Sequence, residues 1–402
     1  MGVFESWFGR FFKSAKFRFV RSFGGHSTGY DRDAYEHETV RSIIDAIASH
    51  TAKAQAMHVV VDEKGRIKKI KRNSPFSKLL NLQANELMSA YDLKYKLVTQ
   101  VENYTTAMLY VAWDGDMPTA MYPINYRQYE FIQLDEGDWA VRFVDAMGDE
   151  YALPLEDVVV LRKFYNTLDI AGEGNGPVYG VLDLIKVGEE GMSSALRVAN
   201  KIRGLLKQKN ARLDDEDVQS QARKFEENMK KAAEEGGVVG VDLADEYVPI
   251  TTRAYSLDSA QMKDIRDGLY RYWRTSENII KSDYTESQWQ AWYESVIEPR
   301  LTQMGQALTN VCFSQTERDH GNRILFYSSP LLHASVQTKI NIVRASREIG
   351  LLTTNELREL FGYAPVEDGD VRQISLNYTK DSNQDAYQLG DTGEEDTNDQ
   401  NQ

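Results

Sequence analysis

Apolar residues recur at steps of three and four along residues 178–203 and again along residues 253–275, which predicts an amphipathic helix over each segment. The stripe of the first helix consists of Val181, Leu184, Ile185, Met192, Ala195, Leu196, Ala199 and Ile202. The stripe of the second consists of Met262, Ile265, Leu269, Tyr272 and Trp273. Because the two helices flank one charged insert, the pattern predicts a helical hairpin around which the rest of the chain is organised.

The insert, residues 204–252, is charged along most of its length. A helix with one thin apolar seam is predicted over residues 214–235, and short strands are predicted over residues 238–241 and 247–250. About fifty residues with one narrow apolar seam cannot bury a core of their own. We therefore expect neighbouring copies of the chain to complete the insert, which indicates a ring.

Strand and helix patterns are mixed on both sides of the hairpin. Before it, the pattern predicts helices over residues 31–57 and 84–104, and strands over 58–61, 67–71, 107–113, 120–122, 129–134, 139–144 and 158–164. After it, the pattern predicts a long helix over 289–311 with a kink at Pro299, a strand over 323–328, a helix over 336–349 and another capped by Thr353 or Thr354. This mixture predicts an α+β fold.

Composition excludes several classes of protein and of binding site. The single cysteine, Cys312, excludes a disulfide framework and a cysteine zinc site, and its apolar surroundings predict an inert core thiol. The sequence shows no apolar run of membrane-spanning length and no signal peptide, so we expect a soluble, unexported protein. The net charge is −14, which makes tight, non-specific binding of nucleic acid unfavourable, and the acid-rich residues 379–402 are expected to be disordered.

Candidate catalytic chemistry is sparse. The six histidines have no metal-ligand spacing, and no Gly-x-Ser-x-Gly motif occurs. Residues 172–177 lie between a predicted strand and a predicted helix, the context of a phosphate-binding loop, but Pro177 stands in place of the third glycine and no Lys-Ser or Lys-Thr pair follows. We interpret this segment as a hinge, and we expect no enzyme activity, metal or cofactor. A nucleotide-dependent enzyme using the loop Gly172 to Gly180 is an alternative that calorimetry with ATP or NAD would test.

Residues 1–29 form an aromatic and basic arm in which Trp7, Phe11 and Phe12 alternate with bases such as Arg10 and Lys13. One interpretation is a segment that packs when the protein assembles. The alternative is a peripheral membrane adaptor, because aromatic and basic side chains together favour membrane surfaces. Vesicle flotation of the intact chain against a chain that starts near Tyr30 distinguishes the two.

The sequence resembles tailed-bacteriophage portal proteins in four stretches that follow the family's order. The most specific is the C-terminal motif, here Gly350-Leu351-Leu352-Thr353-Thr354-Asn355-Glu356-Leu357-Arg358, then Phe361-Gly362-Tyr363-Ala364-Pro365 and Gly369-Asp370. The others are the helix around Pro299, the segment from Ile279 to Glu286 at the position of the family's tunnel loop, and the glycine-rich lead into Val178. The resemblance covers about residues 35–375. Within the family, the chain resembles the compact portal proteins that form the head–tail connector rings of siphophages.

The resemblance implies the portal fold, with an α+β wing, a two-helix stem, a small α/β clip and a helical crown. The implied divisions are an arm at 1–29, wing at 30–177, stem helices at 178–203 and 253–275, clip at 204–252, tunnel loop at 276–287, the wing's long helix and strand at 288–335, crown at 336–378 and acidic tail at 379–402. It further implies a ring, expected to hold twelve copies, assembled in a bacterial cytoplasm and placed at one capsid vertex of the virion for packaging and ejection of double-stranded DNA. The implied partners are the terminase large subunit, the major capsid protein or a scaffold, a head–tail adaptor, and DNA bound without sequence specificity.

Three groups of residues are expected at functional surfaces. The tunnel-loop residues expected to meet DNA are Asn278, Lys281, Ser282, Asp283 and Tyr284. A basic cluster at the stem–clip corner, which faces DNA or terminase or is simply a solvated helix end, consists of Arg197, Lys201, Arg203, Lys207, Lys209 and Arg212. Gly180, Gly188 and Gly191 each cost about 1 kcal/mol relative to alanine in a helix, which predicts close packing between stem helices of neighbouring subunits.

Overall fold

The computed structural model describes residues 19–27, 34–134, 138–167, 169–201, 204–208, 216, 219–220, 223–228, 231, 245–249, 259–327, 336–359, 361 and 363–372. The chain divides into two compact units. Unit 1 comprises residues 1–30, 42–174 and 277–402, and unit 2 comprises residues 31–41 and 175–276. The boundary between residues 174 and 175 falls inside the glycine-rich segment that we interpreted as a hinge.

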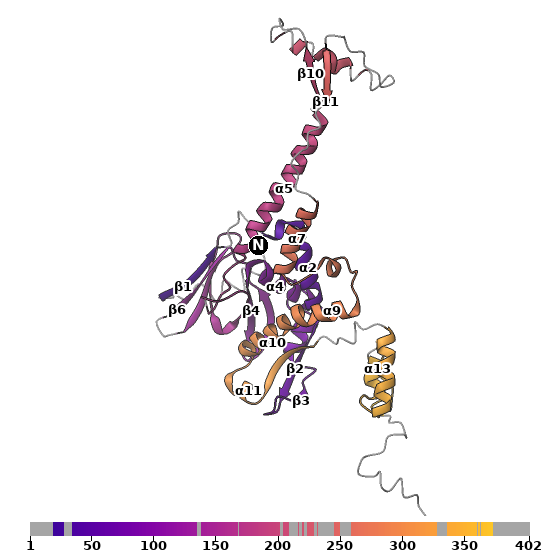
Figure 1. The fold of residues 1–402 in the computed structure, drawn as a ribbon. Helices are drawn as coiled ribbons and strands as arrows, with labels where there is room; N and C mark the ends of the chain where they lie inside the picture. Colours follow the sequence, from indigo (N-terminus) through magenta and orange to yellow (C-terminus); the bar gives the residue numbers. More distant parts are fainter. Residues whose placement is uncertain are drawn as a thin grey trace, which may run out of the picture. The chain divides into compact units, whose positions relative to one another are not determined.

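Unit 1 contains antiparallel sheets (Figure 1). The four-stranded sheet has the order β1-β6-β7-β8, with β1 at Phe19–Ser27, β6 at Gln128–Leu134, β7 at Trp139–Val144 and β8 at Glu150–Pro154. A three-stranded sheet has the order β5-β4-β9, with bounds Met117–Pro123, Thr106–Asp114 and Val158–Arg162. The other three-stranded sheet has the order β12-β2-β3, with bounds Asn322–Tyr327, Gln55–Val61 and Ile67–Ile70.

Helices alternate with these strands along the chain and follow them toward the C-terminus. The helices are α2 at Glu38–Ala52, α3 at Pro75–Asn81, α4 at Ala90–Tyr104, α8 at Glu277–Ile280, α9 at Glu286–Trp292, α10 at Glu298–Cys312, α11 at Gln315–Asp319, α13 at Val336–Ile349 and α14 at Thr354–Glu359. Short 3-10 helices are η1 at Ala34–Glu36 and η2 at Leu155–Asp157. A core that includes Met108, Tyr129, Phe131 and Val141 joins strands of the β1 and β4 sheets.

Several local predictions were wrong at their boundaries. The helix predicted from residue 84 begins at Ala90, because the Ser89 hydroxyl accepts the Asp92 N–H while the Asp92 carboxylate accepts the Ser89 N–H. Helix α3, whose N-cap is Ser74, and strand β8 were not predicted from the sequence pattern. Residues 19–27 of the predicted arm form β1, which pairs with β6 from Phe19 opposite Leu134 to Ser27 opposite Gln128.

The irregularity predicted at Pro299 takes the form of a π-helical segment, Tyr293–Ile297, between α9 and α10. A π-helical turn contains one extra residue, and such turns interrupt α-helices where the regular hydrogen-bond ladder cannot continue. Proline has no backbone N–H to offer that ladder. Pro299 stands at the start of α10 directly after this segment, and the N–H of the preceding Glu298 donates to the Tyr293 carbonyl, five residues earlier, as in a π-helix.

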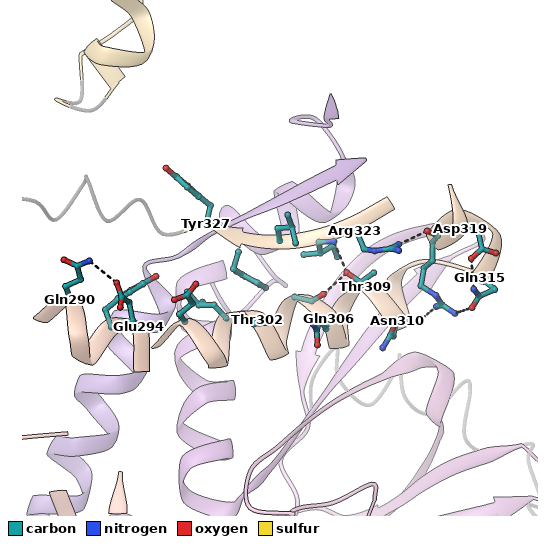
Figure 2. A pocket seen from close by; sticks show the side chains of 18 of the residues that line it. Gln290, Glu294, Thr302, Gln306, Thr309, Asn310, Gln315, Asp319, Arg323 and Tyr327 are labelled. Carbon is teal, nitrogen blue, oxygen red and sulfur yellow. Dashed lines mark hydrogen bonds between the residues drawn. The ribbon is translucent and has the colours of Figure 1, made fainter. Parts of the chain in front are cut away.

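Helix α10 packs tightly against the outer edge of β12. The Ile324 N–H donates to the Thr309 hydroxyl at 2.9 Å, and that hydroxyl donates to the Gly305 carbonyl at 2.7 Å. A side chain at Gly305 would place its Cβ 2.7 Å from the Ile324 carbonyl oxygen, so only glycine permits this approach. Figure 2 shows Thr309 between α10 and β12.

Replacing Thr309 with valine should lower the free energy of unfolding by about 1–3 kcal/mol, because the buried Ile324 N–H loses its acceptor. Thr302 lies on the same helix and is exposed, so Thr302→Val is a matched control that should change stability by less than about 0.5 kcal/mol. Urea unfolding followed by circular dichroism measures both. Equal effects of the two substitutions would contradict this account of the helix–strand contact.

Unit 2 is built around the predicted helical hairpin, which the structure confirms. Helix α5 at Gly176–Lys201 and helix α7 at Ser259–Tyr272 contact each other. Their buried side chains include Ile185 and Leu269, each fully buried. The insert between them begins with β10 at Gly204–Gln208, paired antiparallel with β11 at Asp245–Pro249. Helical backbone is described at residues 219–220 and 223–228 of the predicted insert helix.

The C-terminal motif folds back on itself around Asn355. Its backbone N–H donates to the Gly369 carbonyl at 2.8 Å, and its side-chain oxygen accepts the Val366 N–H at 2.8 Å. The Asn355 amide donates to the Asp370 carboxylate at 2.8 Å, and the Arg358 Nε donates to the Ala364 carbonyl at 2.9 Å. The residues that carried the sequence resemblance thus close a loop by hydrogen bonds. The predicted capping box is confirmed, because Thr353 and Glu356 bond to each other's backbone.

Candidate functional site

The predicted tunnel loop is partly helical. Of residues 276–287, α8 takes Glu277–Ile280 and α9 begins at Glu286, which leaves residue 276 and residues 281–285 irregular. Ser282 has a φ of 58°, the left-handed conformation that ends the α8 turn, and the Asp283 N–H donates to the Asn278 carbonyl at 2.9 Å. The Thr285 capping box then starts α9. Within this turn Asn278, Lys281, Ser282 and Asp283 are exposed, and Tyr284 is half-buried.

The one base of residues 276–287, Lys281, is paired with an acid. The Lys281 ammonium lies 2.5 Å from the Glu277 carboxylate, one helical turn before it, and the two side chains are 66% and 43% exposed. An exposed pair of this kind contributes little to stability. The pair matters instead for electrostatics, because a lysine paired with a carboxylate attracts a phosphate less strongly than an unpaired lysine does.

Helix α5 exposes an apolar face in the single chain. Leu184 is 56% exposed and Val187 is 65% exposed. Gly180 and Gly191 lie on the same face by helical spacing, and a Cβ at Gly180 would meet no atom within 4 Å. We call Gly180, Leu184, Val187 and Gly191 the α5 stripe. Gly188, which we had grouped with the other two glycines, is buried by the chain itself.

The predicted basic cluster is only partly described. Arg203, Lys209 and Arg212 lie outside the described residues, and the backbone alone is described for Arg197, Lys201 and Lys207. The register of β10 and β11 places Lys207 opposite Glu246 and Gln208 opposite Asp245. The register therefore places two acidic positions, distant in sequence, opposite Lys207 and Gln208, which the linear pattern did not reveal. A basic cluster at this corner stays a prediction.

The glycine-rich segment does not offer its N–H groups to a phosphate. The Gly172 N–H donates to the Thr106 hydroxyl at 2.9 Å, and the Gly174 N–H donates to the Thr105 hydroxyl at 2.8 Å. The intervening Glu173 N–H donates to the Phe164 carbonyl at 2.9 Å. A Cβ at Gly172 would lie 2.5 Å from the Lys163 carbonyl oxygen. Glycine is thus required here for close backbone packing, and the geometry opposes the nucleotide-binding alternative.

A groove of about 860 Å³ runs along α9, α10 and β12 (Figure 2). Its carboxylates are Glu294, Glu298 and Asp319, and Figure 2 shows Glu294 near one end and Asp319 near the other. Glu294 accepts a hydrogen bond from Gln290 at 2.9 Å, and Asp319 accepts one from Gln315 at 2.8 Å. Acid–base catalysis requires convergent groups within reach of one substrate atom, and Glu294 and Asp319 do not converge.

Comparison with known proteins identifies the family. The sequence profile described as "Phage portal protein" matches residues 38–362, which is more than half of the chain. The chain belongs to the phage portal protein family.

Curated relatives agree with this family. The portal sequence is 28% identical over 186 residues to the "Probable portal protein" of Lactococcus phage p2, and equally to that of Lactococcus phage SK1. Each match takes in 44% of this chain and 49% of the relative. The chain therefore spans about half the length of the curated relatives it matches.

Solved structures share the portal fold. A chain described as "Neck of empty GTA particle computed with C6 symmetry" has a TM-score of 0.63 and 14% identity, covering 87% of this chain and 97% of that one. A chain described as "Neck of native GTA particle computed with C12 symmetry" has a TM-score of 0.58 and 14% identity, covering 85% and 96%. At this identity the likeness shows the fold, and it confirms the α+β portal architecture.

Unit 1 of this portal protein contains a buried ion cluster. Glu102 on α4 is fully buried, and its carboxylate pairs with Lys163 at 2.5 Å and with Arg300 on α10. Burial by itself would raise the pKa of Glu102, but the two cations outweigh it and lower the pKa to about 2. The cluster joins three segments, namely α4, α10 and the residue that follows β9. Its position therefore indicates a structural role. Sequence reasoning missed it because the three residues are far apart in the chain.

Other chemical groups in this portal protein are unreactive or dispersed. Cys312 is buried, which raises the pKa of its thiol and agrees with the predicted inert core residue. Within the described ranges, no cluster of three His, Cys, Asp or Glu side chains is placed to hold a metal ion. Among those same residues, no helix has both the length and the apolar character that crossing a bilayer requires.

Proposed function

We propose that copies of this chain form the closed ring at one capsid vertex through which double-stranded DNA is packaged and later ejected. The observation that carries the proposal is family membership across residues 38–362, together with a fold shared over 87% of the chain with a neck component of a gene transfer agent particle. The related neck described with C12 symmetry supports a ring of twelve copies. The location is then the portal vertex of a virion, after assembly in the host cytoplasm.

The α5 stripe supports association between copies. Two large apolar side chains on one helix face, Leu184 and Val187, are more than half exposed in the single chain. Exposed apolar faces flanked by glycines favour close helix–helix contact, because burial removes apolar area from water and glycine lets the backbones approach. In the proposed ring this stripe packs against the stem of a neighbouring subunit. Gly180 and Gly191, which have no side chain, let the two helix backbones approach closely.

The charge distribution supports a conduit that does not grip DNA. The chain has a net charge of −14, and Lys281 in the proposed tunnel segment is paired with Glu277. Each phosphate neutralised by a lone base adds affinity, which would slow movement of the duplex. We propose that Asn278, Lys281 and Ser282 make brief, sequence-independent contacts with passing DNA.

The remaining partners follow from the proposed position at the vertex. The insert at residues 204–252 is the proposed clip, to which the terminase large subunit docks, and the motor's chemistry belongs to that separate protein. The crown at residues 336–378 and the wing contact the capsid interior, where the major capsid protein or a scaffold surrounds the ring. A head–tail adaptor binds the ring once packaging is complete.

A genetic experiment tests this function. In the phage that encodes this chain, a stop codon in place of Glu38 should yield capsids without packaged DNA, and supplying the intact chain from a plasmid should restore DNA-filled heads. A stop codon in a tail-fibre gene is the control, because it should leave packaging unchanged. Normal numbers of DNA-filled heads without the chain would contradict the proposal.

A further inference from the structure

A second groove, of about 740 Å³, lies in unit 1 between η2 and the end of α10. Its apolar lining includes Trp113, Trp139, Leu155, Val311 and Phe313. Phe313 is 4% exposed, so it forms the floor, whereas the two tryptophans, Leu155 and Val311 are half-buried. We call this the η2–α10 groove. It offers aromatic surface that the described residues leave partly open to solvent.

The rim of the η2–α10 groove is acidic. Asp138 and Glu156 are exposed, and Asp157 is half-buried. Among described residues, none of these three carboxylates forms an ion pair. The one base in the lining, Arg318, donates instead to the Asn310 and Phe313 carbonyls, each at 2.6 Å, and to the Gln315 side chain at 2.8 Å. The guanidinium thus caps the end of α10 rather than neutralising the rim.

The register of the four-stranded sheet shows where the N-terminal arm enters. Phe19, the first residue of β1, lies opposite Leu134, and the neighbouring Gln133 lies opposite Trp139 on the other side of β6. Two strand spacings separate β1 from β7, so Phe19 starts about 10 Å from Trp139. The chain before Phe19 therefore continues from the end of the sheet at which the η2–α10 groove opens. Eighteen extended residues can reach about 60 Å, so distance does not limit contact.

The chemistry of residues 1–18 matches this groove. The segment contains aromatic side chains at Phe4, Trp7, Phe8, Phe11, Phe12 and Phe17. Its bases are Arg10, Lys13, Lys16 and Arg18, against a single acid, Glu5. Aromatic pairs and cation–aromatic contacts favour such side chains in an aromatic groove, and opposite charges fix the orientation.

We propose that residues 1–18 dock into the η2–α10 groove of their own chain, with aromatic side chains against Trp113, Trp139 and Phe313 and bases facing Asp138, Glu156 and Asp157. The short separation between Phe19 and Trp139 favours the arm of the same chain over that of another copy, because a tethered segment acts at high local concentration. Docking continues the path of β1 across the end of the sheet. This assignment is independent of the portal function, because it concerns a contact within one chain.

Site-specific photo-crosslinking tests the docking in the intact protein. The chain carries Phe12→p-benzoylphenylalanine, and equal amounts of unlabelled and nitrogen-15-labelled protein are mixed before irradiation. We expect crosslinked peptides from residues 138–157 or 310–318, joined within chains of one isotope. Reversing the rim charge with Asp138→Lys and Glu156→Lys should lower their yield at least about fivefold. Glu63→Lys, at an exposed turn between β2 and β3, is the matched control and should leave the yield unchanged.

Three outcomes would overturn the proposal. Crosslinks to other parts of the chain would place the arm elsewhere. Crosslinks that join the two isotopes would show that the arm docks on another copy. If anionic phospholipid vesicles capture the arm and groove crosslinks are absent both with and without them, the arm is a membrane-binding segment instead. Circular dichroism of the charge-reversed variant confirms that it is folded, so a loss of crosslinks reports the groove.

Discussion

Replacing Leu184 and Val187 together with glutamate should leave the chain folded but unable to form rings. Both side chains are more than half exposed in the single chain, so their replacement should change its stability by less than about 1 kcal/mol. In the proposed ring the same positions would be buried between neighbours, where an unpaired carboxylate costs several kcal/mol per junction, as much as a strong interface contact contributes. Because every junction repeats the change, we expect closed rings to disappear.

Negative-stain microscopy and sedimentation measure this effect directly. The matched control is the double substitution Leu184→Met and Val187→Ile, which keeps both side chains apolar and close to their original volume and should preserve rings. Thermal unfolding of each variant shows whether the protein is folded. If the glutamate variant formed rings as readily as the original chain, the α5 stripe would not be a subunit interface.

Replacing Glu102 with glutamine should lower the free energy of unfolding of unit 1 by about 3–5 kcal/mol. The carboxylate is fully buried between Lys163 and Arg300, whose side chains are only 16% and 17% exposed. Removing the negative charge leaves two largely buried cations facing each other. Glu150→Gln is the control, because Glu150 pairs with Arg142 at 3.1 Å while 58% exposed, and loss of such a pair should cost less than about 1 kcal/mol.

The same cluster predicts how stability depends on pH. The pKa of Glu102 is about 2 in the folded protein, below the ordinary value of 4.5 for a glutamate. A lowered folded-state pKa means that the unfolded chain binds the proton more readily, so the contribution of Glu102 is complete above pH 4.5 and is lost as the pH falls towards 2. Urea midpoints between pH 6 and pH 3 should therefore fall less steeply for Glu102→Gln than for the original chain. Identical slopes would contradict a role for this carboxylate.

The hairpin was predictable because its signal is local. Residues such as Ile185 and Leu269 repeat at helical spacing, and burial of one face is what holds α5 against α7. The same pattern could not separate the face that the chain buries from the face that it exposes. Leu184 was read as part of the same stripe as Ile185, and Gly188 was grouped with Gly180, whereas the structure places Leu184 and Gly180 outward and Ile185 and Gly188 inward.

Contacts between distant segments explain most of what sequence reasoning missed. Strand β1 pairs with β6, more than a hundred residues later, so Phe19–Ser27 was read as part of a separate arm. Glu102, Lys163 and Arg300 meet only because three elements converge. Lys207 lies opposite Glu246 through a strand register that no local pattern encodes. In contrast, the C-terminal motif could be matched to the family from the sequence, and the residues that its hydrogen bonds join around Asn355 lie within one short segment.

The measurement that tests the central claim most directly is the mass and shape of the purified full-length chain. Native mass spectrometry with single-particle electron microscopy should show closed rings with a central channel, near twelve times the 45.9 kDa of one chain. The rings should persist at moderate salt, because apolar contacts along α5 are not screened. A well-folded particle that keeps the mass of one chain at every concentration and salt tested would contradict the account.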